Sequence, residues 1–187
     1  MGQRSQIYIS YTNEKKENVL VARYYSWNYG SRMISRARGL IEWLDNTKDG
    51  GILNSWFHGK ISRIADVNFD LRDVVLSSDL IAECEDSPVE ERRYYIFNQD
   101  NNDGKLFIKI NTDGTISYAF TDWNNLYPMT AYEYMEWQNY YDEEDDGSNC
   151  KNNQTYIVNN AKLMNLVEID DFINANYVNL PKAEIMG

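Results

Sequence analysis

The sequence has few of the side chains on which most catalytic centres depend. It contains one histidine, His58, and two cysteines, Cys84 and Cys150. Any Ser-His-Asp or Cys-His set would have to use His58, and no serine stands in a G-x-S-x-G turn. Cys84 lies among acidic residues, which disfavour the reactive thiolate. We therefore identify no catalytic residue and favour a non-enzymatic role, with an enzymatic role as the alternative.

Motifs for metals and cofactors are also missing. The cysteines do not have the spacing of a zinc site or a disulfide framework, and we interpret them as free thiols of a reducing compartment. No glycine-rich phosphate-binding loop is present. The run from Asp142 to Gly147 matches the first positions of an EF-hand calcium loop, but Asn153 stands where that loop needs a glutamate. We favour a solvated acidic polar loop over residues 142–154, and we expect no metal and no cofactor.

Long apolar runs are absent as well. No segment approaches the roughly 18 apolar residues that a membrane span needs, and the first residues lack the apolar core of a signal peptide. Hydrophobic residues still make up 43% of the 187 positions, which is enough for a folded core. We expect one cytoplasmic domain over residues 1–187, with sub-lobes at 1–65 and 94–187, and no membrane contact.

Acidic residues are in excess, and their distribution is uneven. The net charge is -11. Residues 1–63 hold ten Lys/Arg and five Asp/Glu, a net of +5, whereas residues 64–187 hold eight and twenty-four, a net of -16. Such asymmetry indicates charged partners, with internal pairing of the two parts as the alternative. Direct nucleic-acid binding is not expected, because it requires clustered Lys and Arg.

The spacing of apolar residues predicts both strands and helices. Alternation predicts strands at 4–11, 19–25, 92–97, 105–110 and 115–120, the last two joined by the turn Asp113-Gly114. A stripe of period 3.6 predicts a helix at 32–47, with Gly30 supplying an unusual backbone angle and Ser31 as N-cap. Further helices are expected at 52–67 and at 128–141, the latter capped by Thr130, and a short strand and a helix within 156–178.

These elements predict an α+β fold. Because hairpins join most neighbouring strands, we expect a largely antiparallel sheet of about five strands, with helices packed on one face.

Carboxylates and aromatic rings occur together in the second half of the chain. Rows of carboxylates can imitate phosphates, and flat rings can imitate bases, so this surface suits a protein whose groove normally holds nucleic acid. A role in solubility alone is the alternative. The candidate partner-binding residues are Glu133, Glu136, Tyr140, Tyr141, Asp142, Glu143, Glu144, Asp145 and Asp146.

The opposite charge gathers beside the densest aromatic segment. Arg32, Arg36 and Arg38 lie on the helix expected at 32–47, shortly after Trp27. Positive charge in the first turns of a helix opposes the helix dipole, so these arginines are not expected to serve helix stability. They either pair with the acidic half of the chain or, together with Trp27, form an anion-binding site.

The first 45 residues or so carry a resemblance. The segments "MGQRSQIYISY" and "VLVARYYSWNYGSRMISRARGLIEWL" resemble small proteins of phages and prophage-like elements in Firmicutes. Those proteins begin with a Met-Gly-x-Arg strand, followed by a second strand, an aromatic turn of the type Tyr-x-Gln-Trp-Asp-Gly-Tyr and an amphipathic helix. Here Ser26 and Asn28 replace the Gln and Asp of that turn. The resemblance assigns no activity, but it implies an origin in a mobile element, where small acidic proteins often inhibit host defence.

The sequence therefore predicts a non-enzymatic phage or mobile-element protein. Its expected partner is a host nucleic-acid-binding defence protein such as a CRISPR effector nuclease, which it would inhibit in the manner of anti-CRISPR proteins. Two alternatives stay open: a small enzyme or anionic-ligand-binding protein that uses the Trp27–Arg38 region, and a structural protein that self-associates through its tyrosines.

Overall fold

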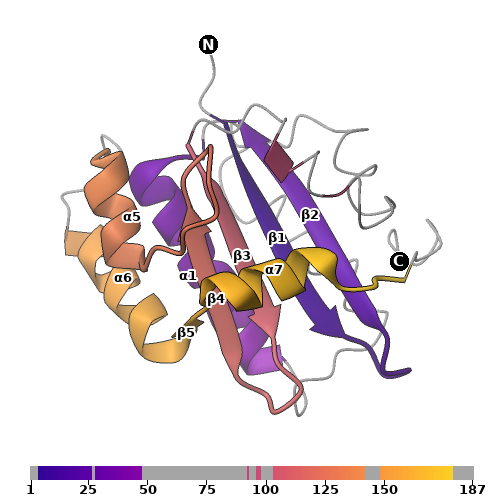
Figure 1. Ribbon diagram of the computed structural model, residues 1–187. Helices are drawn as coiled ribbons and strands as arrows, with labels where there is room; N and C mark the ends of the chain where they lie inside the picture. The colour runs from indigo at the N-terminus through magenta and orange to yellow at the C-terminus, as the bar shows by residue number, and fades with distance from the viewer. Residues whose placement is uncertain are drawn as a thin grey trace.

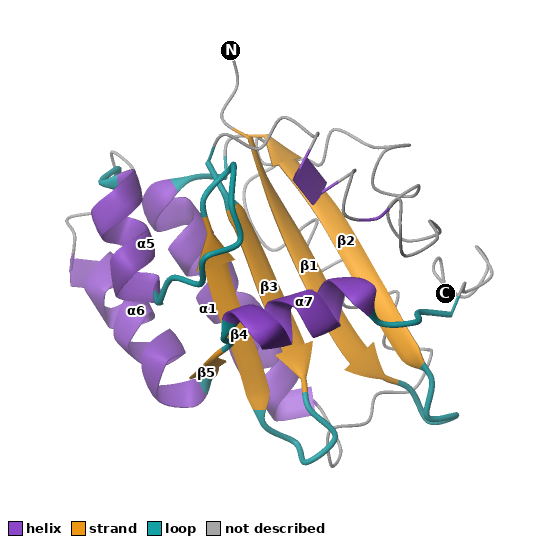
Figure 2. Cartoon of the chain, viewed as in Figure 1, coloured by secondary structure: helices purple, strands orange, loops and turns teal. Residues whose placement is uncertain are grey.

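A computed structural model of the protein describes residues 4–26, 28–47, 92, 96–97, 103–141 and 148–178. Five strands and four helices have defined bounds (Figures 1 and 2). In chain order they are β1 (Arg4–Thr12), β2 (Asn18–Ser26), α1 (Gly30–Thr47), β3 (Lys105–Ile110), β4 (Ile116–Thr121), α5 (Ala131–Gln138), α6 (Ser148–Asn160), β5 (Lys162–Leu163) and α7 (Leu166–Asn174). The α+β class expected from the sequence is therefore confirmed.

The strands form one mixed sheet in the order β2-β1-β3-β4-β5. The pairs β1–β2 and β3–β4 are antiparallel hairpins, but β1 pairs with β3, and β4 with β5, in parallel. The expectation of a largely antiparallel sheet is wrong at these two junctions, because turn residues specify a hairpin locally and say nothing of how two hairpins join. Since β1 and β3 come from the two expected sub-lobes, the sub-lobes share a single sheet.

Helices cover both faces of the sheet, not one as expected. Ile7 and Ile9 of β1 face a core with Met33 and Leu40 of α1, and α5 and α6 contribute to the same core. On the opposite face, α7 supplies Ile169, Phe172 and Ile173 to a second core. Figure 1 shows α7 crossing one side of the sheet while α1 lies behind it.

The second core explains why helices on one face of the sheet would not be enough. Tyr8 and Phe107 point away from α1, and their rings stack with centroids 5.2 Å apart. Phe172 of α7 meets Phe107 edge-on at 5.3 Å. Every residue of β4 is buried, and so is nearly every residue of β1 and β3. Such burial is typical of strands that are covered on both faces.

Several local expectations are confirmed. The hairpin of β1 and β2, helix α1, the β3–β4 hairpin and α5 lie where the periodicity predicts them. Gly30 has a φ of +50°, as expected, and Gly114 has a φ of +91° in the β3–β4 turn. Ser31 lies inside α1 and is not its N-cap.

Besides the Ser31 cap, two further local expectations are wrong. Arg92, Ile96 and Phe97 are helical, so the strand expected at 92–97 is not formed at these residues. The polar loop expected to continue past residue 147 is helix α6 from Ser148 onward, because Cys150, Gln154 and Ile157 lie on one buried face at helical spacing. The helix expected at 52–67 lies outside the described residues.

Candidate protein-binding surface

Helix α5 has well-defined ends. At its start the Thr130 side chain accepts the Glu133 N–H, and Glu133 Oε1 accepts the Thr130 N–H, both at 3.1 Å. This reciprocal pair is a capping box, and it satisfies two backbone donors that the helix itself leaves open. At the other end Asn139 adopts a left-handed conformation with a φ of 44°, and its N–H donates to the Met135 carbonyl at 2.7 Å.

The inner face of α5 is fixed by buried contacts. Tyr134 is fully buried, stacks on Phe120 at 4.6 Å and donates its hydroxyl to the Asp103 carbonyl at 3.0 Å. Burial raises the pKa of the Tyr134 hydroxyl well above its usual range, because the phenolate would lose its hydration. Gln154 of α6 also donates to the Ala131 carbonyl at 3.3 Å. The helix therefore presents its outer face in one fixed orientation.

The outer face of α5 combines carboxylates with aromatic rings. Tyr132, Glu133, Glu136 and Trp137 are all exposed, and the exposed residues Tyr140 and Tyr141 follow directly after the helix. We call these six residues the α5 surface. The structure thus brings Glu133, Glu136, Tyr140 and Tyr141, four of the predicted partner-binding residues, into one region. The other five, Asp142 to Asp146, lie outside the described residues.

The segment that leaves α5 is held against the start of α1. The Ser31 N–H donates to the Tyr140 carbonyl at 3.0 Å, and the rings of Tyr29 and Tyr140 meet edge-on at 4.8 Å. A Cβ added to Gly30 would lie 2.0 Å from the Tyr140 carbonyl oxygen, so only glycine allows this approach. Tyr140 is therefore held in a fixed position beside the start of α1.

A second exposed aromatic pair, which the sequence did not single out, lies in the loop between β4 and α5. Trp123 is 52% exposed and Tyr127 is 66% exposed. Asp122 organises the loop, because its carboxylate accepts the N–H groups of Asn124 and Asn125 at 2.8 and 3.0 Å. The sequence signal that could have indicated this loop is the Asp-x-Asn-Asn pattern, in which a carboxylate can bond to the backbone that follows it.

A buried lysine supports the same loop. The Lys105 ammonium donates to the backbone carbonyls of Asp122 at 2.9 Å and Trp123 at 3.1 Å. Its side chain is fully buried, and the ammonium lies 5.1 Å from the centre of the Phe97 ring. Desolvation lowers the pKa of Lys105 to about 8, although the Asp122 carboxylate opposes this effect.

The three arginines of the alternative anion site have different environments. Arg36 is 1% exposed, stacks over Tyr25 at 4.2 Å and donates to Asn28 at 3.3 Å, which places it in the core. Arg32 is half-buried, 5.8 Å from the Tyr29 ring centre. Trp27 lies outside the described residues, and the three arginines face different rings, Tyr29, Tyr25 and Tyr156.

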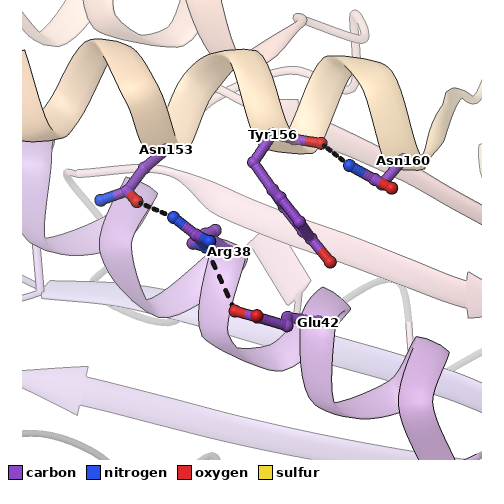
Figure 3. A network of polar contacts seen from close by, with 5 residues as sticks. All are labelled: Arg38, Glu42, Asn153, Tyr156 and Asn160. Atoms are coloured by element: carbon purple, nitrogen blue, oxygen red, sulfur yellow. Dashed lines mark hydrogen bonds and ion pairs between the residues drawn. The ribbon is translucent and has the colours of Figure 1, made fainter.

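Arg38 links α1 to α6, as Figure 3 shows. Its Nε donates to Glu42 at 3.2 Å, and its Nη1 donates to Asn153 at 3.0 Å. Its guanidinium also lies over the Tyr156 ring, 4.5 Å from the centroid. Arg38 therefore forms its ion pair with Glu42 of its own helix, not with a carboxylate of the acidic half as expected, and its contacts in that half are with Asn153 and Tyr156.

The remaining features of interest are the cysteines, the histidine, metal-binding groups and membrane-spanning helices. Cys150 is a free thiol buried in the core, whereas His58 and Cys84 lie outside the described residues. In the described part of the chain, no group of three or more His, Cys, Asp or Glu residues could hold a metal ion. No helix there is both long and apolar enough to cross a membrane.

Comparisons with known proteins do not add an assignment. No protein-family model, curated protein or solved structure matches this chain.

Proposed function

We propose that this protein is a non-enzymatic interaction protein of phage or mobile-element origin. Its α5 surface would bind the basic surface of a host nucleic-acid-binding defence protein, such as a CRISPR effector nuclease, and inhibit it in the manner of an anti-CRISPR protein. The observation that carries this proposal is the exposed combination of carboxylates and rings on α5, a helix whose ends and inner face are fixed.

The exposure of the rings supports a binding role. Water-exposed aromatic rings lose the stabilisation that burial would give, so several on one surface indicate a partner. Aromatic residues also dominate the binding energy of protein interfaces, and they lose little conformational entropy when already held. Tyr132 is held in this way, because its hydroxyl lies 2.8 Å from Thr155 Oγ1 of α6.

The charge of the region supports a basic partner. Between Lys109 and Lys151 the sequence contains no lysine, arginine or histidine, but nine Asp and Glu residues. Within the described residues, neither Glu133 nor Glu136 forms an ion pair. A surface with such an excess of carboxylates attracts a basic protein over several ångströms and directs its approach. A groove that binds nucleic acid is such a basic surface.

The anion-binding alternative has less support. Arg36 already contacts Asn28 and Tyr25 in the core, and the Ser31 N–H already donates to Tyr140. An anion at the start of α1 would have to displace these contacts.

The proposal can be tested with two variants matched in charge. Glu133→Gln/Glu136→Lys changes the α5 surface, and glutamine at position 133 retains the acceptor of the capping box. Glu14→Gln/Asp171→Lys makes the same change in net charge at two exposed residues of the β1–β2 turn and α7. Each protein, tagged, is used to retain partners from a nuclease-treated bacterial lysate, and any retained protein is identified by mass spectrometry and purified.

The expected partner is a nucleic-acid-binding protein that binds the wild type and the Glu14→Gln/Asp171→Lys control but not Glu133→Gln/Glu136→Lys. DNA or RNA added to the purified pair should compete with this protein for the partner. If the two variants bind the partner equally, or if nucleic acid does not compete, the proposal is wrong. Light scattering that shows a dimer lost only in Glu133→Gln/Glu136→Lys would instead assign the α5 surface to self-association.

A further inference from the structure

The α5 surface has a regular arrangement of acid and ring. Residues four apart on a helix are neighbours on its surface, which places Tyr132 beside Glu136 and Glu133 beside Trp137. Each exposed ring of the helix therefore has a carboxylate one turn away. We call these four residues the α5 quartet.

Three members of the quartet are held before any partner binds. Glu133 is positioned by the Thr130 N–H, and Tyr132 lies 2.8 Å from Thr155 through their hydroxyls. The Trp137 ring lies 5.8 Å from the Tyr134 ring, and its edge approaches the backbone of Gly104. Glu136 is exposed on the same face, so its carboxylate can adjust to a bound group.

The chain itself shows which cation suits such a pair. Arg38 stacks over Tyr156 at 4.5 Å while its Nε donates to the Glu42 carboxylate, so one guanidinium uses a ring and an acid together (Figure 3). Arg36 and Arg92 also stack over tyrosines, at 4.2 and 4.8 Å. A planar guanidinium can stack on a ring and still direct its N–H groups sideways to a carboxylate. A lysine ammonium is a compact and strongly hydrated charge that gains less from the ring.

We propose that the α5 quartet recognises arginine side chains of its partner in preference to lysine. The quartet offers rings and carboxylates of the same kinds as those around Arg38. Within the described residues, no lysine or arginine forms an ion pair or a cation–π contact with any of its four members. The partner surface is therefore an arginine-bearing one, and the guanidinium stacks on Trp137 or Tyr132 while it pairs with Glu133 or Glu136. This inference rests on the proposed function and specifies its partner.

The test uses two synthetic probes, an oligo-arginine and an oligo-lysine peptide of equal length and equal charge, each with a fluorescent label. Binding to the full-length protein is measured by fluorescence anisotropy at low and at moderate salt. The arginine peptide should bind about tenfold more tightly, because each exposed ring adds a modest cation–π contribution. Both affinities should fall as salt rises, since the charges are exposed.

Three variants separate the roles of ring and charge. Tyr132→Leu/Trp137→Leu should remove the preference for arginine while both peptides still bind. Glu133→Gln/Glu136→Gln should weaken both peptides. Tyr127→Leu, which removes an exposed ring outside the quartet, should leave the preference unchanged. Circular dichroism melting of each variant verifies that the fold is retained.

The outcomes distinguish this inference from the proposed function. Equal affinity of the wild type for both peptides would overturn arginine recognition and leave a basic partner supported. A preference that survives Tyr132→Leu/Trp137→Leu would also overturn it. Binding of neither peptide would contradict the arginine inference and the basic partner together.

Discussion

The N–H of Ser31 donates to the carbonyl of Tyr140 across 3.0 Å, and this bond joins the first turn of α1 to the segment that leaves α5. A helix start has N–H groups without partners inside the helix, and here one of them is satisfied by a carbonyl from a distant part of the chain. The position of the exposed Tyr140 and Tyr141 therefore depends on the packing of α1.

Gly30→Ala should destabilise the protein and disturb the α5 surface. A φ of +50° disfavours any residue with a Cβ, and the added Cβ would overlap the Tyr140 carbonyl. The conformational part alone costs about 1–2 kcal/mol, and the overlap adds to it. Urea denaturation of Gly30→Ala and of Gly114→Ala measures the difference, because Gly114 also has a positive φ but lies in a turn between the exposed residues Asp113 and Thr115. If the two variants lose the same free energy of unfolding, the Tyr140 contact is unimportant.

Lys105 should make the protein more stable as the pH rises above 8. Its pKa is about 8 in the native state, against 10.5 for a lysine that is fully hydrated, so in this range the unfolded chain binds a proton that the native chain has released. The free energy of unfolding then increases with pH, by at most about 1.4 kcal/mol per unit. Measurements should stay below about pH 9.5, because tyrosine ionisation in the unfolded chain acts in the opposite direction at higher pH.

The variant Lys105→Met identifies the source of that increase. Denaturant unfolding between pH 8 and about pH 9.5 should show the rise in the wild type and in Lys109→Met, but not in Lys105→Met. A rise that persists in Lys105→Met would assign it to another group.

Arg38 and Tyr156 should be energetically coupled. Removal of the ring by Tyr156→Leu and of the guanidinium by Arg38→Leu should each destabilise the protein, and together by about 0.5–1 kcal/mol less than the sum. Glu42→Gln should cost less than about 0.5 kcal/mol, because the ion pair is partly exposed. A double-mutant cycle from urea denaturation measures the coupling, and additive losses would show that the stacking in Figure 3 contributes nothing.

Thr130→Ala should destabilise the protein by removing the cap at the start of α5. It removes the hydroxyl that accepts the Glu133 N–H and should lower the free energy of unfolding by about 1 kcal/mol, whereas Thr130→Ser should retain most of it. Thermal melting of both variants tests this expectation. Unchanged melting of Thr130→Ala would mean that the capping box is not needed to define α5.

The sequence predicted what is encoded locally. Asp113 and Gly114 specify their hairpin through adjacent residues: Asp113 accepts the Thr115 N–H at 2.9 Å, and Gly114 adopts a positive φ. Thr130 and Glu133 likewise define the start of α5 within four residues. The exposure of Glu133, Glu136, Tyr140 and Tyr141 could be predicted for the same reason, because these residues lie on or next to one short helix.

What the sequence did not predict depends on contacts between distant segments. The parallel pairing of β1 with β3, and α7 on the second face, are set by tertiary packing that leaves no local signal. For Arg36 the residue type alone favours a surface position, because arginine is rarely buried. In the structure Asn28 and Tyr25 surround it, and this environment could not be read from its position on the helix.

The parallel contact between β1 and β3 has a consequence for how the chain folds. Gln6 pairs opposite Lys105, about 100 residues later in the sequence. Closing so long a loop must precede any gain from the pairing, and contacts of this separation slow folding. On the ribosome the β1–β2 hairpin is synthesised long before β3 emerges. During that time the backbone groups along one edge of β1 have no partner strand. Until β3 arrives, this open edge of β1 can pair with another chain.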